Sequence, residues 1–242
     1  MEDGGLAGLL ALGLAVVHLF ASKLRFLDVD PRSRWLSMAG GASVAYVFLH
    51  LFPELALAQE SFEESGPLDT GHEIYLLSMV GLAAFYGLER AAKVSRHERR
   101  EAGEEDIPGP GVFWLHVVSF ALYNALVGYL LLHREDPTRR GLLLFFLAMA
   151  LHFLVNDYGL RKDHRGAYDR SGRWILSAAV LLGWGIGTQV EIGELPLALL
   201  FAFLAGGIVL NVLKEELPAE RESRFSAFIL GAGGYAAILL LL

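Results

Sequence analysis

Residues 141–159 read GLLLFFLAMALHFLVNDYG, an apolar stretch without a Lys or Arg. Basic residues follow it almost at once, beginning with Arg161 and Lys162. A helix needs about 20 mostly apolar residues to cross the roughly 30 Å hydrocarbon core of a bilayer. We therefore predict that this stretch forms a transmembrane helix.

Seven further stretches share this pattern. The eight are residues 5–22, 36–57, 74–88, 112–132, 141–159, 174–190, 195–213 and 225–242. The third is short and reaches membrane length only when interfacial residues are added. A composition of 54% hydrophobic and 19% charged residues suits a chain whose solvent is mostly lipid. The sequence predicts an all-α polytopic membrane protein that forms one transmembrane domain over residues 1–242, with no separate soluble domain.

The loops predict the orientation, because cytoplasmic connections retain Lys and Arg. Of the 20 basic residues, 17 fall after the first, third, fifth and seventh stretches, and only Arg134, Arg139 and Arg140 fall on the other side. Both termini are therefore expected on the non-cytoplasmic side of a multi-pass protein of the cell (inner) membrane. The longest connection, residues 89–111, ends in Pro-Gly-Pro-Gly and is predicted to be a short cytoplasmic linker.

Two pairs of stretches resemble each other. The second and seventh both carry a Gly-Gly pair followed by a segment with Leu, Pro and Glu, and the third and eighth both carry a Gly four residues before an aromatic residue. The matching segments are Gly40-Gly41 with His50–Glu54, Gly206-Gly207 with Glu216–Glu220, Gly81 with Phe85, and Gly231 with Tyr235. Because matching stretches run in opposite directions, we predict an inverted repeat of spans 1–3 and 6–8 around spans 4 and 5, as in secondary transporters. Chance similarity is the alternative, since small residues are common wherever membrane helices pack closely.

Polar side chains gather in the central pair of stretches. They are His116, Ser119, Tyr123 and Asn124 on the fourth, and His152, Asn156 and Asp157 on the fifth. Helical spacing places His116, Ser119 and Tyr123 on one face and sets His152 one turn from Asn156. Polar groups inside a membrane are costly and mark function by default. We expect hydroxyl, amide and imidazole groups of the two helices to meet at mid-membrane.

At these residues the chain resembles the ZIP family, the Zrt/Irt-like divalent-metal transporters. The second stretch, from Ala39-Gly40-Gly41 to His50-Leu51-Phe52-Pro53-Glu54, is similar to the family's second helix, and Ala205–Pro218 is similar to its seventh. The resemblance extends through the eight spans and the cytoplasmic third connection. It implies a membrane carrier for Zn, Fe or a similar divalent ion, with a metal site between the fourth and fifth helices.

The metal motif departs from the family. Where the fourth helix of the family carries H-N-x-P-E-G, this chain has Ser119–Asn124, with Gly128 four residues on, and where the fifth carries H-E/K-x-P-E/H, it has His152–Asn156. Only His152 remains as an unchanged ligand. Zinc sites use imidazole, thiolate or carboxylate, and the chain has no cysteine. We therefore expect a weakened site, with Zn or another divalent cation as substrate, at His152, Asn156, Asp157 and His116.

Other candidate residues are assigned to the ion pathway or to packing. The pathway candidates are Ser119, Tyr123, Asn124, His50 and Glu54, and the helix-packing candidates are Gly40, Gly41, Gly206 and Gly207. His50 and Glu54 stand four residues apart, so they form either a metal entrance or an ion pair at a helix end. We interpret His18 as a satisfied packing residue and His164 as a solvated one.

Two alternatives to transport remain. One is a non-transporting relative that keeps the fold for sensing or assembly, since a fold does not fix a function. The other is an intramembrane zinc hydrolase that combines His116, His152 and Asp157 with Ser119, although no H-x-x-x-H pair supports it. We expect a protein that is not an enzyme. The expected partners are the lipid bilayer and a divalent metal ion, with a homodimer compatible with this interpretation and no nucleic acid.

Overall fold

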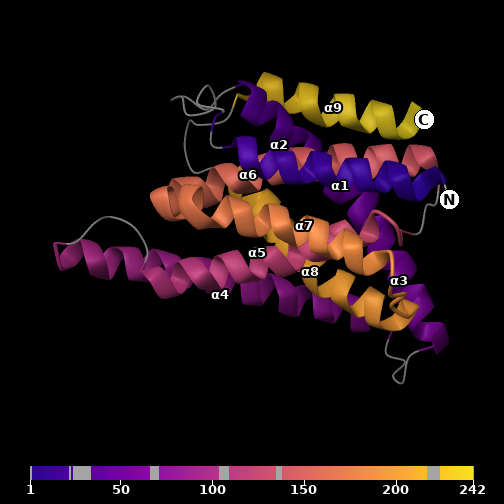
Figure 1. Ribbon diagram of the computed structural model, residues 1–242, viewed down its shortest axis with the longest axis horizontal. Helices are drawn as coiled ribbons and strands as arrows, with labels where there is room; N and C mark the ends of the chain where they lie inside the picture. The colour runs from indigo at the N-terminus through magenta and orange to yellow at the C-terminus, as the bar shows by residue number, and fades with distance from the viewer. Residues whose placement is uncertain are drawn as a thin grey trace. The chain divides into compact units, whose positions relative to one another are not determined.

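All regular structure in the described residues is helical (Figure 1). The computed structural model describes residues 2–21, 23, 34–65, 71–103, 109–134, 138–216 and 224–241. The elements are α1 Glu2–Ala21, α2 Arg34–Tyr46, the π-helical turn η2 Val47–Leu51, α3 Phe52–Ser65, α4 Glu73–Glu101, α5 Pro110–Leu130, α6 Arg139–Ala167, the π-helical turn η3 Tyr168–Gly172, α7 Arg173–Gly187, α8 Glu194–Glu216 and α9 Phe225–Leu241. Since α2, η2 and α3 run on without a break, each predicted stretch falls on its own helical segment. The prediction of an all-α fold is confirmed.

Six of these segments are long and apolar enough to cross a membrane, and Phe225–Leu240 in α9 is a shorter apolar helix. The outward face of α1 illustrates the pattern, because Leu9, Leu12, Val16 and Phe20 are all about half exposed or more. They recur every three or four residues, so they form one apolar stripe on the helix. An apolar exposed face suits a lipid solvent, and the fold is that of a helical membrane protein.

The predicted linker at residues 89–111 is helical in its first half, because α4 continues to Glu101. Charged residues end the apolar stretch but not the helix. The Lys93 Nζ lies 3.7 Å from the Glu89 Oε1. The His97 Nε2 lies 3.3 Å from the Glu101 Oε1. Both pairs have the i,i+4 spacing that stabilises a helix. The linker therefore reduces to the residues between α4 and α5, of which 104–108 lie outside the described residues, as do Leu217, Pro218 and Glu220 of the predicted repeat.

The helices divide into two compact units. Unit 1 is Met1–Phe26 with Leu88–Val190, and unit 2 is Leu27–Gly87 with Glu191–Leu242. Unit 1 holds α1, α5, α6 and α7, while unit 2 holds α2, α3, α8, α9 and the first half of α4. The predicted central pair, α5 and α6, is therefore packed with the first helix and with α7.

Unit 2 contains two close helix crossings, each made by a glycine from both helices. A Cβ at Gly41 of α2 would collide with the carbonyl of Phe228 in α9, and one at Gly231 of α9 would collide with the carbonyl of Met38 in α2. The crossing of α4 and α8 is built the same way. There Gly81 lies against the carbonyl of Phe203, Gly206 lies against that of Ser78, and Gly207 lies against the Phe85 ring. Small residues allow this backbone contact between membrane helices.

Unit 1 is built on a third crossing, between α5 and α7, where Gly128 and Gly183 lie against the carbonyls of Val180 and Ala125. Helix α1 packs on the same unit, and the Ser177 hydroxyl of α7 donates to the Ala15 carbonyl of α1 at 2.9 Å. Leu14 of α1 and Phe153 of α6 are fully buried. The packing places one face of α1, including His18, in the interior of unit 1.

Candidate functional site

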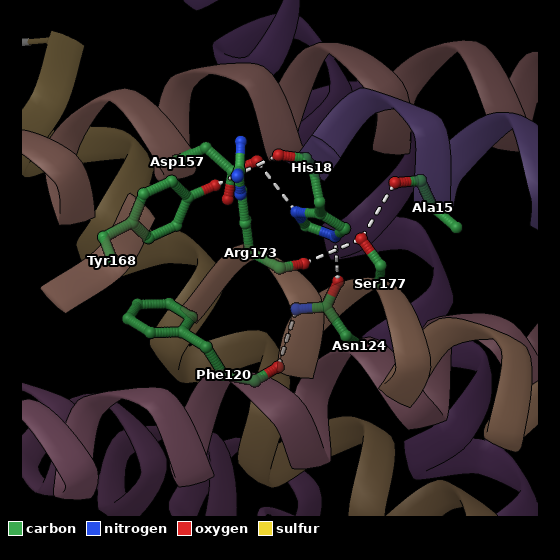
Figure 2. Close-up of polar contacts among 8 residues, drawn as sticks. All are labelled: Ala15, His18, Phe120, Asn124, Asp157, Tyr168, Arg173 and Ser177. Carbon is green, nitrogen blue, oxygen red and sulfur yellow. Dashed lines mark hydrogen bonds and ion pairs between the residues drawn. The ribbon is translucent and has the colours of Figure 1, made fainter. Parts of the chain in front are cut away.

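His18 is the centre of a buried polar cluster in unit 1 (Figure 2). Its Nδ1 lies 2.8 Å from Oδ2 of Asp157, and its Nε2 lies 2.7 Å from Oδ1 of Asn124. The three side chains come from α1, α6 and α5, and each is 0% exposed. Groups separated by more than a hundred residues in the sequence are therefore joined by two short hydrogen bonds.

The cluster is held in place by its surroundings. Asn124 Nδ2 donates to the Phe120 carbonyl one turn earlier at 2.7 Å, which fixes the orientation of the amide. The ring of Phe153 stacks on His18 with 4.5 Å between centroids. The Tyr168 hydroxyl of η3 donates to the His18 carbonyl at 3.5 Å. Burial, with a further contribution from the Asp157 carboxylate, raises the pKa of Tyr168 far above its usual range, so the hydroxyl keeps its proton.

A second buried pair joins α5 and α6. His116 Nδ1 lies 2.9 Å from His164 Nε2, and the Phe113 ring packs edge-on against His164. His164 is only 2% exposed, so the prediction that it is solvated was wrong. The sequence places His164 beyond the apolar stretch, but α6 continues as a helix to Ala167 and turns this side chain inward.

The predicted central metal residues lie in different surroundings. His152 is buried against the rings of Tyr123 and Phe153, with 5.7 Å between its centroid and that of Tyr123. Asn156 is buried one turn further along α6. His116 is hydrogen-bonded to His164, and Asp157 is hydrogen-bonded to His18. Within the described ranges, no group of three or more His, Cys, Asp or Glu side chains is placed to hold a metal ion.

Two predicted pathway residues of α5 have partners of their own. The Ser119 hydroxyl donates to the Leu115 carbonyl of its own helix at 2.8 Å. The buried Tyr123 hydroxyl donates to the Met149 sulfur at 3.3 Å. Asn124, the third pathway candidate on this helix, belongs to the His18 cluster.

No family model, curated protein or solved structure matches this chain. The assignment of a function therefore depends on the residues and their geometry.

His50 and Glu54 form an ion pair in unit 2, with 3.0 Å between Nε2 and Oε1. His50 belongs to η2, and its ring lies 5.2 Å from that of Tyr46. Both members of the pair are partly exposed, at 29% and 21%. The geometry agrees with the ion-pair interpretation of the two that the sequence left open.

The sequence interprets His18 as a satisfied packing residue, and the structure shows it buried with both ring nitrogens hydrogen-bonded. Sequence reasoning missed its partners, Asn124 and Asp157. One signal was available, because His18 is the only ionisable residue in the interior of the first stretch. An ionisable group inside a membrane span is by default a functional candidate with a partner to be named.

Proposed function

We propose that this chain is a ZIP-like membrane carrier for a divalent cation of the Zn or Fe type, with a weakened site in unit 1. One observation carries the proposal: buried imidazole, amide and carboxylate side chains gather on α5 and α6. They are His116, Asn124, His152, Asn156, Asp157 and His164. These are the two helices between which the ZIP resemblance expects the metal.

The energetic cost of these groups favours a functional role. Burying a polar group without compensation costs several kcal/mol in an apolar medium, and ionisable groups in membrane spans mark ion and substrate paths. Hydrophobic side chains would fill the same positions on α5 and α6 at no such cost. The concentration of imidazole, amide and carboxylate in one unit therefore supports a site for a cation.

The glycine crossings support the inverted repeat that the proposal requires. The predicted repeat relates the second span to the seventh and the third to the eighth. Under this relation, the crossing of α2 and α9 at Gly41 and Gly231 corresponds to the crossing of α8 and α4 at Gly206 and Gly81. Each crossing is made by one glycine of a matching Gly-Gly pair and by Gly81 or Gly231, which match each other; the contacts pair Gly41 with Gly206, one residue away from the alignment of the two Gly-Gly pairs. A pair of equivalent contacts is expected if the two halves descend from one repeated unit.

The division into units suggests which helices move. In this proposal α1, α5, α6 and α7 move together as one body during transport, and the weak site on α5 and α6 faces each side of the membrane in turn. Weak binding suits conduction, because an ion that enters must also leave. The excess of Lys and Arg in alternate loops supports an orientation with both termini on the non-cytoplasmic side.

Flux measurements test the proposal. The full chain in liposomes should take up Zn²⁺ or Fe²⁺ in a saturable manner, and His152→Ala or Asn156→Ala should lower the uptake. Leu142→Ala is the matched control, because Leu142 is a buried apolar residue of the same helix that belongs to neither the proposed site nor the predicted pathway. Uptake equal to that of empty liposomes would refute the proposal. Equal uptake in wild type and both variants would remove His152 and Asn156 from the site.

A non-transporting relative is the second candidate, and the complete hydrogen bonding of the His18 ring favours it. Both ring nitrogens of His18 are satisfied by protein groups, as they are in a purely structural cluster. This alternative predicts a folded protein with neither metal flux nor metal binding. The hydrolase alternative has less support, because Ser119, His116 and Asp157 are each bonded to a different partner.

A further inference from the structure

The orientation of Asn124 determines which nitrogen of His18 carries a hydrogen. Asn124 Nδ2 donates to the Phe120 carbonyl, so Oδ1 faces the imidazole and accepts a hydrogen bond from Nε2 at 2.7 Å. In the neutral ring, Nδ1 then carries a lone pair. Metal-binding histidines are held in the same way, with the second nitrogen donating to an oxygen that fixes the tautomer and the ring orientation.

The lone pair of Nδ1 points at a carboxylate. Asp157 Oδ2 lies 2.8 Å away, and two electron-rich atoms approach so closely only with a positive charge between them. That charge is either one shared proton or a metal cation. The other carboxylate oxygen, Oδ1, is buried and accepts no hydrogen bond in the part of the chain that the structure describes. Asp157 therefore has unused capacity as a ligand.

We infer that His18 Nδ1 and the Asp157 carboxylate are the protein ligands of a divalent cation of the Zn type, with Asn124 as the residue that positions His18. The inference rests on the proposed function and names the ligands of its site. It assigns the site to α1 and α6, whereas the sequence assigned it to α5 and α6 around His152.

The change in geometry that binding requires is small. Zinc bonds of about 2.0–2.1 Å at a tetrahedral angle separate the two ligand atoms by about 3.3 Å. The present 2.8 Å between Nδ1 and Oδ2 must therefore widen by about 0.5 Å. The protonated Tyr168 hydroxyl, bonded to the His18 carbonyl, is a neutral oxygen beside the pair.

The ligand set accounts for a weak site. One imidazole and one carboxylate are fewer than the three or four protein ligands of catalytic or structural zinc, so water completes the coordination. When the dication binds, the shared proton leaves to water, and the charge at the pair rises by one unit. A dication held by a single anionic ligand is released more readily than one held by the family's motif.

Equilibrium binding of Zn²⁺ to the purified full chain in detergent tests the inference at fixed pH. Asp157→Asn keeps the shape of the side chain and removes the charge, and we expect it to weaken binding on the order of 100-fold or more, since loss of an outer-shell partner alone costs 10–100-fold. His18→Gln should have the same effect. His133→Gln is the matched control, because His133 is a histidine of unit 1 outside the proposed site, with its Nε2 hydrogen-bonded to the Gly187 carbonyl.

The outcomes separate this inference from the proposed carrier. Binding that is lost in Asp157→Asn while wild type shows no flux supports the site and refutes the carrier. Flux that depends on His152 while binding is unchanged in Asp157→Asn refutes the site and keeps the carrier. Loss of binding in His164→Gln but not in Asp157→Asn assigns the ion to the His116 pair and overturns the inference. Absence of any Zn²⁺ binding to wild type overturns it as well.

A measurement on wild type keeps the inference falsifiable if a variant fails to fold. X-ray absorption at the zinc edge of the loaded protein should show one imidazole and a first shell of oxygen and nitrogen. Two imidazoles in that shell would contradict the assignment, because only His18 supplies a ring to the proposed site.

Discussion

His18 and Asp157 are 139 residues apart in the sequence, yet Nδ1 and Oδ2 lie 2.8 Å from each other where both side chains are 0% exposed. The contact joins α1 to α6 and brings a basic and an acidic group into an interior that is otherwise largely apolar. A buried pair of this kind makes each partner depend on the other. Its consequences can be measured both in stability and in ligand binding.

Removing one partner of the pair should destabilise the protein strongly. Asp157→Leu leaves the imidazole buried without its carboxylate, and breaking a buried pair costs about 3–5 kcal/mol. The double variant His18→Leu/Asp157→Leu should recover much of that loss, because apolar replacement of both partners is often neutral. The midpoint of unfolding in detergent measures both changes. A double variant as unstable as the sum of the single ones would show that the pair is not coupled.

Loss of the Asn124 amide should also be costly. Asn124→Leu leaves His18 Nε2 buried without an acceptor, and an unsatisfied buried donor costs about 1–3 kcal/mol. Ser119→Ala on the same helix is the control, since its hydroxyl bonds only to its own backbone and should change stability little. Equal midpoints for the two variants would mean that the Asn124 hydrogen bond does not stabilise the fold.

The crossing of α2 and α9 should be sensitive to a single methyl group. Gly231→Ala places a Cβ against the Met38 carbonyl, and overpacking of this kind costs about 1–3 kcal/mol. Gly233→Ala, two residues along the same helix, meets nothing within 4 Å and should be neutral or stabilising by up to about 1 kcal/mol. Thermal unfolding of the two variants tests the contrast. The crossing would be refuted by a Gly231→Ala protein as stable as Gly233→Ala.

The orientation can be tested directly because the chain contains no cysteine. A single cysteine at Lys93, whose side chain is 71% exposed on α4, should react with an impermeant maleimide only after the membrane is opened. A cysteine at Thr138, in the connection before α6, should react in intact cells. The reverse pattern would place the termini in the cytoplasm.

Hydropathy was sufficient to predict the helices but not where they end. The apolar stretch at residues 74–88 marks the part of α4 that suits lipid, while the helix itself extends to Glu101. Charged residues such as Glu89 and Lys93 prefer water to lipid, but as an i,i+4 pair they also stabilise a helix. Composition alone therefore does not separate the end of a membrane span from the end of a helix. The same reason explains the misplacement of His164, which lies on the continued α6.

The polar partners were harder to predict than the helices. The concentration of imidazole and amide groups on α5 and α6 is visible in the sequence. The partner of Asp157 is not, because His18 lies on α1 and nothing local in the sequence links the two. Helical spacing shows which residues of one helix share a face, whereas the neighbour across an interface depends on packing. Close approaches such as that of Gly128 to Val180 decide which helices become neighbours.

The most direct test of the account is anomalous scattering from crystals of the full chain soaked in Cd²⁺. The account predicts a peak in unit 1 within coordination distance of His18 Nδ1 and the Asp157 carboxylate. A peak confined to the partly exposed His50 and Glu54 pair, a peak at His116 and His164, or no peak in unit 1 would contradict it.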